Sequence, residues 1–344
     1  MATHARVGRR AWLAVSVALA AVAVGASLVV ASSPEPPVYS SPASPMPSHT
    51  VPASEFYVDP AGAAAEQVRA WEQTGRTADA ALLRKIADRP VATWFADAEP
   101  GFAVRAQTLV GDAARAGRLP VLTLYHIPHR DCGGQSAGGA PDGPAYRDWI
   151  AALATALDGH RAVVVLEPDA VAQAVQGCLS DTRTAERYAL LAHAVDTLRA
   201  VSGVTVYLDA GNPSWIRSPA KMTAGLRKAG IARSHGFALN VANFETTTAN
   251  VRYGTALSRI LGGAHFVIDT SRNGNGPARP GAGDQHWCNP PGRKLGEAPT
   301  RRTGHALVDA YLWIKRPGES DGACGPDAPP AGVWWPEYAL DLAR

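Results

Sequence analysis

The feature that most constrains the fold is a repeated alternation of short β-type runs with longer segments of helical periodicity. Seven β-type runs follow one another, at residues 91–96, 121–126, 162–166, 204–208, 236–241, 265–269 and 310–314. Segments of helical periodicity lie at residues 64–88, 102–117, 145–158, 184–202, 219–230 and 247–261, and a last helix is expected at 336–343. This alternation predicts an α/β fold with a parallel sheet, either a barrel or a doubly wound sheet.

The residues that follow the β-type runs favour the barrel. Almost every run ends in polar side chains of the kinds used in catalysis: Tyr125, His126, Arg130, Asp131, Glu167, Asp169, Asp209, Asn240, Asn243, Asp269, Ser271, Arg272, Asn273, Lys315, Glu319 and Asp321. In a (β/α) barrel the carboxyl ends of all strands meet at one face, where such proteins keep their active sites. No glycine-rich phosphate loop follows the first run, so a dinucleotide-binding doubly wound fold is the weaker alternative.

Residues 1–54 differ in composition from the rest of the chain. Three arginines precede an apolar stretch, and a Pro/Ser-rich run follows it. This order predicts a signal peptide at residues 1–31, a linker at 32–54 and one globular domain at 55–344. The apolar stretch is also long enough to span a bilayer, so retention as a membrane anchor competes with cleavage, which the small residues that follow favour. In both cases the domain faces the outside of the cell.

Four cysteines in an exported chain are expected to form two disulfides. In general four cysteines allow three pairings. Cys132 and Cys178 follow the second and third β-type runs, and Cys288 and Cys324 follow the sixth and seventh. Since loops on neighbouring strands lie side by side, we expect the pairs Cys132–Cys178 and Cys288–Cys324, which would hold the long loops in place.

Composition narrows the class of function. The net charge of +3, with no basic run beyond the N-terminus, gives no footprint of a nucleic-acid-binding protein. Nine tryptophans are a high count for 344 residues, and exposed tryptophans would suit a sugar-binding surface. Aspartates follow several of the predicted strands, and cleavage of a glycosidic bond needs one carboxyl group as acid and a second to control the attacking water. Aspartates at strand ends also bind metals and hydroxyl groups, so their positions alone indicate a carboxylate-based hydrolase without proving one.

Seven sequence blocks occur in order along the globular part. They are Tyr125-His-Ile-Pro-His-Arg-Asp-Cys132, Leu166-Glu-Pro-Asp169, Tyr207-Leu-Asp-Ala-Gly211 with Trp215, Asn240-Val-Ala-Asn-Phe244, Phe266-Val-Ile-Asp-Thr-Ser-Arg-Asn-Gly274, Trp287-Cys-Asn-Pro-Pro-Gly-Arg293 and Leu312-Trp-Ile-Lys-Arg-Pro-Gly-Glu-Ser-Asp321. In these blocks the chain resembles glycoside hydrolase family 6, the inverting cellulases that include endoglucanases and cellobiohydrolases. The resemblance implies a distorted seven-stranded (β/α) barrel that hydrolyses β-1,4-glucan or cello-oligosaccharides with inversion at the anomeric carbon.

The resemblance also implies a role for each matching catalytic residue. Asp169 would be the general acid, and Asp131 would hold the acid's proton and organise the water chain. Tyr125 would press the sugar in the cleavage subsite toward a distorted ring. Asp209 matches a carboxylate that tunes the acid, and Asp321 matches the candidate base, whose direct role is disputed within the family.

A second set of residues matches positions that bind the glucan. Lys315 and Glu319 would hydrogen-bond the sugars, Asn243 would contribute to the same surface, and the expected stacking platforms are Trp94, Trp215 and Trp287. The chain departs from the family pattern at Asn212-Pro213, where His or Ser is common, and at Ala242 and Phe244, where Ser and Tyr are frequent. These changes remove hydroxyl groups near the glucosyl subsites and leave the preferred glucan open.

Loop length bears on whether cleavage occurs within the glucan or from its end. The segments 132–143 and 325–333 are short, which favours an open cleft and endo cleavage. The alternatives are an exo-acting cellobiohydrolase and, from another class, a glucan-binding protein that has lost activity. We expect a monomer with no nucleic-acid partner.

Some polar residues have a structural interpretation beside the functional one. Glu167 could cap a strand end or act in catalysis, and Asp269 is interpreted as a structural partner of Arg272. His126 and His129 have the spacing of a pair of metal ligands, but no third ligand is evident. We therefore expect neither a metal nor a cofactor.

Overall fold

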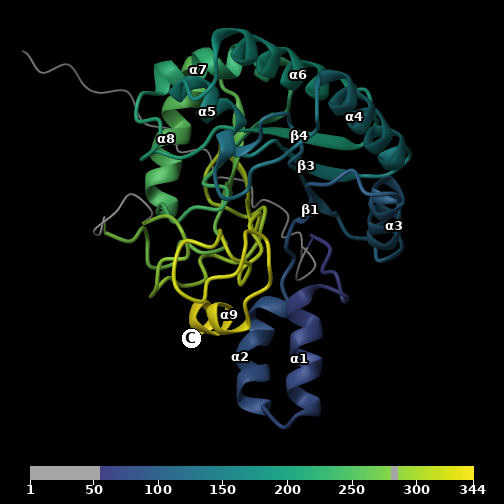
Figure 1. The fold of residues 1–344 in the computed structure, drawn as a ribbon, viewed down its shortest axis with the longest axis vertical. Helices are drawn as coiled ribbons and strands as arrows, with labels where there is room; N and C mark the ends of the chain where they lie inside the picture. The colour runs from purple at the N-terminus through teal and green to yellow at the C-terminus, as the bar shows by residue number, and fades with distance from the viewer. Residues whose placement is uncertain (1–54, 280–285) are drawn as a thin grey trace, which may run out of the picture. The chain divides into compact units, whose positions relative to one another are not determined.

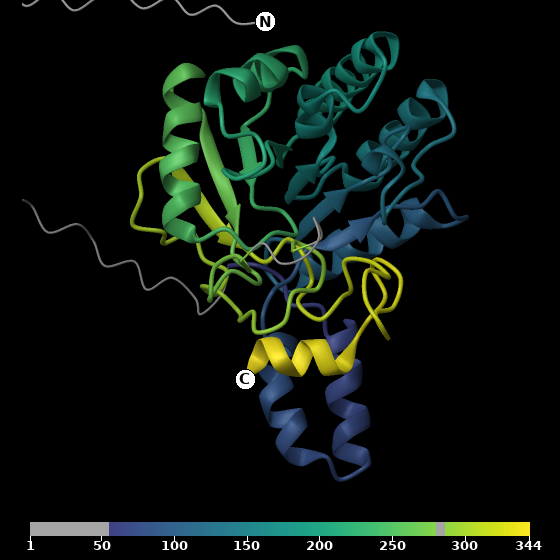
Figure 2. The same ribbon diagram turned by 60° about the vertical axis from the view of Figure 1, so that its left-hand side comes forward.

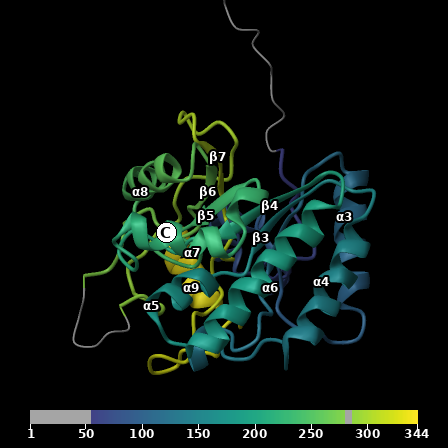
Figure 3. The ribbon, with the colours of Figure 1, turned by 90° about the horizontal axis from the view of Figure 1, so that it is seen from above.

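The computed structural model describes residues 55–279 and 286–344, so the predicted signal peptide and linker lie outside the described residues. The described residues belong to one compact unit, Thr50–Arg344. Its strands, shown in Figures 1 and 3, are β1 (Thr93–Phe95), β2 (Val121–Leu124), β3 (Ala162–Leu166), β4 (Val204–Asp209), β5 (Gly236–Leu239), β6 (His265–Asp269) and β7 (Val308–Leu312). They form one parallel sheet in chain order.

The sheet curls around a core of its own side chains. Alternate residues of a strand face opposite sides, and here Val163 and Val165 join an inner cluster while Val164 and Leu166 join an outer one. The inner cluster gathers residues from β2 to β7, with Trp94 of β1 against it. This confirms the predicted seven-stranded parallel barrel in the form of a curled half-barrel: within the described residues β1 and β7 form no ladder, and the Ala92 N–H donates to the Trp313 carbonyl at 2.9 Å.

Helices return the chain from the carboxyl end of each of the strands β1 to β5 to the amino end of the next, and they cover the outer face of the sheet (Figure 2). They are α3 (Phe102–Arg115), α4 (Gly143–Leu157), α5 (Ala170–Gln176), α6 (Asp181–Arg199), α7 (Pro219–Lys228) and α8 (Thr247–Ile260), with short 3₁₀ turns at Asp131–Gly133 and Ile231–Arg233. The described residues between β6 and β7 contain no helix. Side chains of Asp142, Ser180, Ser218 and Thr246 accept backbone N–H bonds at helix starts, as N-caps do.

The structure corrects two predicted elements and adds one helix. The single helix expected at 64–88 is two helices, α1 (Ala63–Gln73) and α2 (Thr77–Ala87), because the chain turns at Gly75, whose φ of +80° suits glycine. α5 was not predicted as a helix of its own, since seven residues are too few to establish a period. β7 begins at Val308, ahead of the predicted run, and α9 (Pro336–Ala343) is where it was expected, packed on α1 and α2.

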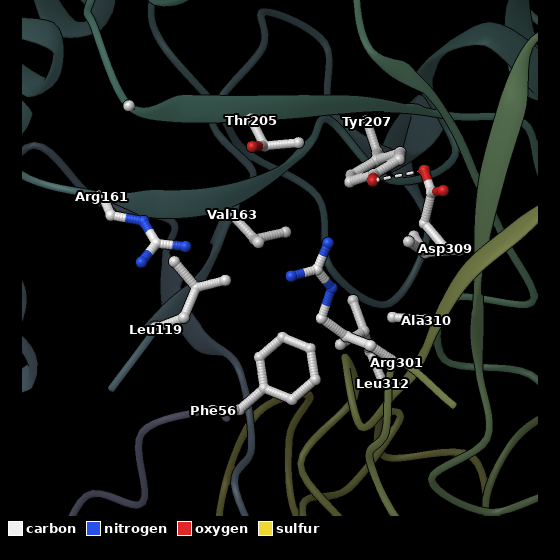
Figure 4. A pocket seen from close by; sticks show the side chains of 12 residues that line it. Phe56, Leu119, Arg161, Val163, Thr205, Tyr207, Arg301, Asp309, Ala310 and Leu312 are labelled. Carbon is white, nitrogen blue, oxygen red and sulfur yellow. Dashed lines mark hydrogen bonds between the residues drawn. The ribbon is translucent and has the colours of Figure 1, made fainter. Parts of the chain in front are cut away.

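Among residues 55–279 and 286–344, no helix has both the length and the apolar character needed to cross a membrane. A cavity of about 90 Å³ lies near the amino ends of the strands, where Arg161 and Arg301 stand around an apolar floor (Figure 4). The residues expected to carry chemistry lie at the other ends of the strands, which we call the carboxyl face.

Candidate active site

Three of the predicted catalytic residues are linked by hydrogen bonds across the loops after β2 and β3. The Tyr125 hydroxyl donates to Oδ2 of Asp169 at 3.4 Å and lies 3.1 Å from Oγ of Ser136. Ser136 in turn donates from its hydroxyl and its N–H to Oδ2 of Asp131, at 3.0 and 2.8 Å. Asp169 and Asp131 are therefore the two ends of one hydrogen-bonded chain.

Asp169 occupies a position that favours its protonated form. It stands at the start of α5 with a left-handed φ of +70° and is partly exposed. Burial, and then the negative charges of Asp209 and Asp131, raise the pKa of Asp169 well above its usual value. A carboxyl group in this setting keeps its proton to higher pH than an exposed aspartate does and can act as a general acid.

Asp209 ends β4 and is fully buried beside Asp169. Its Oδ1 accepts the N–H groups of Asp169 and Gly211 at 2.9 and 3.0 Å, whereas its buried Oδ2 has no hydrogen-bond partner among the described residues. Burial raises the pKa of Asp209 although the backbone N–H groups oppose the shift. Asp209 thus both orients the Asp169 backbone and adds to the negative charge next to it.

The remaining predicted acidic residues belong to a separate group after β7. Asp321 pairs with Arg272 at 2.9 Å and lies 3.8 Å from Nζ of Lys315, and it accepts the Asn289 N–H at 3.0 Å. Glu319 pairs with Arg316 at 2.6 Å. Burial lowers the pKa of Lys315 and raises the pKa of Glu319. Two cations hold Asp321, so its carboxylate is fixed in place rather than free to rotate.

The predicted sugar-binding aromatic residues differ in how firmly they are held. Trp94 donates to the Ile314 carbonyl at 2.7 Å and meets the ring of Tyr125 edge-on, with centroids 5.5 Å apart. Trp215 donates to Gln176 at 2.9 Å, and Trp287 is 37% exposed. Trp94 therefore lies against the ring of Tyr125, and Trp287 is the most exposed of the three tryptophans.

Asn243, the remaining predicted sugar-binding residue, is half-buried in the loop after β5. Its side-chain oxygen accepts the Phe244 N–H at 2.9 Å, and its own N–H donates to the Asn240 carbonyl at 2.9 Å. The side-chain oxygen is thus engaged within the loop.

Both disulfides join loops of the carboxyl face in the predicted pairing. Cys132 is bonded to Cys178, and Cys288 to Cys324, with Cα atoms 6.2 and 6.3 Å apart. The first bridge lies one residue after Asp131 and ties its loop to the segment after α5.

Two further acids connect loops through backbone N–H groups. Glu167 is fully buried and accepts the N–H groups of His126 and Ile127 at 3.0 to 3.1 Å, and burial raises its pKa to about 7. Asp269 accepts the N–H groups of Ala242 and Lys315 at 3.0 and 2.9 Å. The prediction that Asp269 pairs with Arg272 is wrong, because that guanidinium donates to Asp321 instead.

Sequence reasoning missed three residues of this site: Ser136, Gln173 and Arg187. Ser136 lies in a glycine-rich segment without periodicity, and Arg187 lies in a long helix whose other arginines are exposed. The one available signal was Gln173, a polar residue inside the apolar run Ala170-Val-Ala-Gln-Ala-Val175.

One of the two histidines considered as metal ligands, His126, has other partners. Nδ1 of His126 lies 3.2 Å from the Ala96 carbonyl, and its ring lies 4.9 Å from that of Trp149. In the part of the chain that the structure describes, no three His, Cys, Asp or Glu side chains are grouped so that they could hold a metal ion.

Comparison with known proteins points to one family. Residues 51–344 match the model of glycosyl hydrolases family 6. The chain is 43% identical over 297 residues to endoglucanase A of Cellulomonas fimi, covering 85% of this chain and 62% of that protein. It is 42% identical over 295 residues to endoglucanase 1 of Streptomyces halstedii, covering 83% of this chain and 88% of that protein.

A solved structure agrees with these relatives. The endoglucanase Cel6 from Mycobacterium tuberculosis, in complex with methyl-cellobiosyl-4-deoxy-4-thio-β-D-cellobioside, superposes with a TM-score of 0.79 at 46% identity, covering 85% of this chain and 97% of that one. The likeness therefore extends over almost all of the described residues.

Proposed function

The chain belongs to glycosyl hydrolase family 6, and from this membership and the geometry of the carboxyl face we propose that it is an endo-acting β-1,4-glucanase that inverts the anomeric carbon. The observation that carries the proposal is the setting of Asp169. Its carboxyl group has a raised pKa and is joined through Tyr125 and Ser136 to a second carboxyl group, that of Asp131. Inverting hydrolysis needs such a division between an acid and a second carboxylate.

Asp169, Asp131 and Tyr125 of the hydrogen-bonded chain, together with Asp209, each have a role in the proposed reaction. Asp169 donates its proton to the glycosidic oxygen as the bond from that oxygen to the anomeric carbon breaks. A water molecule attacks the opposite face of the sugar, and its proton passes toward Asp131 through a further water. Tyr125 crowds the sugar ring at the point of cleavage, and Asp209 keeps the pKa of Asp169 high.

Asp321 is the weaker choice for the base that takes the proton directly. Its carboxylate is held by Arg272 at 2.9 Å and by the Asn289 N–H at 3.0 Å, with Lys315 at 3.8 Å. A carboxylate so well satisfied by cations and donors gains little from accepting a proton. We assign Asp321 the role of holding Lys315 and the loop after β7 in place, and its own charge contributes to the field around the sugar.

The glucan is proposed to lie across the carboxyl face. Trp94, Trp215 and Trp287 would stack on pyranose rings, and Lys315, Glu319 and Asn243 would contact their hydroxyl groups. The loops at 132–143 and 325–333 are short, which favours internal cleavage over threading of a chain end. Both curated relatives described above carry the name endoglucanase, in agreement with that choice.

The place of action and the assembly are also proposals. The chain spans 62% of the length of the Cellulomonas fimi relative, so activity on polymeric cellulose is inferred for the catalytic unit only. We propose that the protein is secreted, since its two disulfides suit an oxidising exterior, and that it acts as a monomer.

The test is the stereochemistry of the first product. Wild-type protein and cellohexaose are followed by proton NMR from the earliest minutes, and inversion predicts that new reducing ends form as the α-anomer. Retention would reject the proposed mechanism, and no turnover with intact binding would favour an inactive glucan-binding protein. Viscometry of carboxymethyl-cellulose separates endo from exo action, because internal cleavage lowers viscosity rapidly while release of cellobiose barely changes it.

A further inference from the structure

The side chain of Asp131 is held from two directions. Its Oδ2 accepts both bonds from Ser136, within the same loop. Its Oδ1 accepts a bond at 3.2 Å from Nε2 of Gln173, which belongs to α5 and is separated from it by 42 residues. A half-buried carboxylate with donors on both oxygens has little rotational freedom, so the residue that supplies the second donor helps to set its direction.

A buried arginine determines which way the Gln173 amide points. Gln173 is 6% exposed, and its Oε1 accepts a bond from Nη1 of Arg187 at 3.1 Å. Since a guanidinium only donates, it fixes the amide oxygen on its own side and leaves the amide N–H₂ to face Asp131. The orientation of Gln173 is therefore dictated by Arg187.

Arg187 also holds the turn that leads into Asp131. Its Nη2 donates to the carbonyl oxygens of Pro128 and His129 at 3.1 and 2.6 Å. In this turn His129, Asp131 and Cys132 all have left-handed φ angles, which are energetically unfavourable for non-glycine residues. External support of this kind is what keeps such a conformation populated.

The use of a buried cation for this purpose is itself informative. Arg187 is 2% exposed, and among the described residues no carboxylate lies within ion-pair distance of it. Burying a charge without an ion pair is costly, and bonds to carbonyl oxygens only partly offset that cost. Three of the four hydrogen bonds of Arg187 go to the turn before Asp131 and to Gln173, and the fourth, at 3.5 Å, goes to the Ala170 carbonyl at the start of α5. A side chain retained at such cost and directed mainly at these groups fits a positioning role.

We propose that Gln173 and Arg187 are positioning residues that act through Asp131. Arg187 holds the turn at Pro128-His129 and orients Gln173, and Gln173 then fixes Asp131 in the direction from which it serves the water chain to Asp169. The inference rests on the proposed function. It adds two residues, from α5 and α6, to a site whose other members come from the strands and from the loops that follow them.

The first experiment compares Gln173→Leu with wild type on cellohexaose. Loss of a hydrogen bond to a charged group should lower kcat roughly ten- to hundredfold. KM should stay within about twofold, because neither residue is placed against the sugar. Thr223→Val is the matched control: it removes a buried hydrogen bond of α7, to the Ala220 carbonyl at 3.0 Å, and should lower Tm while leaving kcat unchanged.

The second experiment uses Gln173→Glu, which has the same shape but offers Asp131 a carboxylate in place of a donor. Its kcat should be lower than that of Gln173→Leu near neutral pH and should recover as the pH falls, because protonation of the new carboxyl group restores a donor. A purely structural role would lower stability without this pH-dependent recovery. If either variant fails to fold, Gln173→Asn, too short to reach both partners, is expected to give the kcat loss of Gln173→Leu.

A double-mutant cycle tests the link to Arg187. Arg187→Lys keeps the charge but replaces two separate donor nitrogens, Nη1 toward Gln173 and Nη2 toward the turn, with a single ammonium group, so its loss in kcat should not add to that of Gln173→Leu. Additive losses, or Gln173 variants with unchanged kcat and pH profile beside an active wild type, would overturn the inference. A wild type without turnover would instead overturn the proposed function, and the inference with it.

Discussion

The carboxyl and amino ends of the strands differ in whether the charged side chains near them are buried. At the carboxyl face Asp209 and Glu167 are fully buried and Asp169 is half-buried, and burial raises the pKa of each. At the amino ends, around the cavity in Figure 4, Arg161 and Arg301 are exposed. The arginines at the amino ends of the strands are therefore exposed to solvent, whereas the acids at the carboxyl ends are shielded from it.

The two ends of the strands also differ in backbone conformation. Nine non-glycine residues of the described chain have left-handed φ angles, and all of them lie in loops that follow the carboxyl ends of strands. Asp309, near the amino end of β7, is instead satisfied without strain by Tyr207 and His265, each at 2.7 Å. Among the described residues, unfavourable backbone conformations are thus tolerated at the carboxyl face, where they set the directions of the functional side chains.

The largest expected effect comes from removing the acid. Asp169→Asn should lower kcat on cellohexaose roughly 10²–10⁴-fold, because the glycosidic oxygen would leave without a proton. An aryl cellobioside with a good leaving group should be partly spared. Steady-state rates on the two substrates measure the contrast. Asp309→Asn, at the amino end, should leave both rates nearly unchanged, and an equal loss on both substrates for Asp169→Asn would contradict the acid assignment.

A second prediction concerns stability and pH. Glu167 has a pKa of about 7 in the fold and 4.5 as its ordinary value, so the folded state binds more protons between these two values. Its contribution to stability is fully present below pH 4.5 and is lost as the pH rises through 7, a change on the order of 3 kcal/mol.

Urea unfolding of wild type and Glu167→Gln between pH 4 and 8 checks this. The variant cannot ionise, so its free energy of unfolding should fall less steeply over that range. Asp309→Asn should retain the wild-type slope. If the free energies of unfolding of Glu167→Gln and wild type change in parallel with pH, ionisation of Glu167 does not cause the pH dependence.

A third prediction separates the charge of Asp209 from its hydrogen bonds. Asp209→Asn keeps an oxygen for the Asp169 N–H but removes a negative charge that raises the pKa of Asp169. The basic limb of the kcat/KM profile should move to lower pH, so that activity above that limb is lost. Activity below that limb should be retained. A loss that is uniform across pH would indicate a structural role instead.

The smallest effect is expected at the amino end. Tyr207→Phe removes the hydroxyl that donates to Asp309 at 2.7 Å and should lower the free energy of unfolding by about 1 kcal/mol. The kcat and KM on cellohexaose should remain those of wild type. A clear change in kcat would mean that the two ends of the barrel are coupled.

Much of the fold, and the face on which the functional residues lie, could be predicted from the sequence. The strand positions followed from the periodicity, and the residue types at the strand ends placed Tyr125, Asp131, Asp169 and Asp209 on one face. The break at Gly75 was missed because both halves of that segment have helical periodicity, and a single glycine is tolerated in such a pattern. β7 was placed late because it begins with Val308-Asp309, where a polar residue interrupts the apolar run.

The partners of the acidic residues were not predictable in the same way. Arg272 could have paired with Asp269 or Asp321, and only the packed loops direct it to Asp321 at 2.9 Å. Likewise the sequence does not distinguish a Glu167 that acts on substrate from one that binds the N–H groups of His126 and Ile127.

By itself the sequence determined the alternation of strands and helices, the face to which the functional residues belong, and the cysteines available for pairing. These are properties of period and residue type, which act over short stretches of chain. The tertiary structure decided the partners: Gln173 for Asp131 across 42 residues, and Arg187 for the His129 carbonyl across 58. The physical reason is that the direction of a hydrogen bond and the desolvation of a charge depend on what surrounds the group in space, and those surroundings exist only once α5 and α6 are packed against the loops.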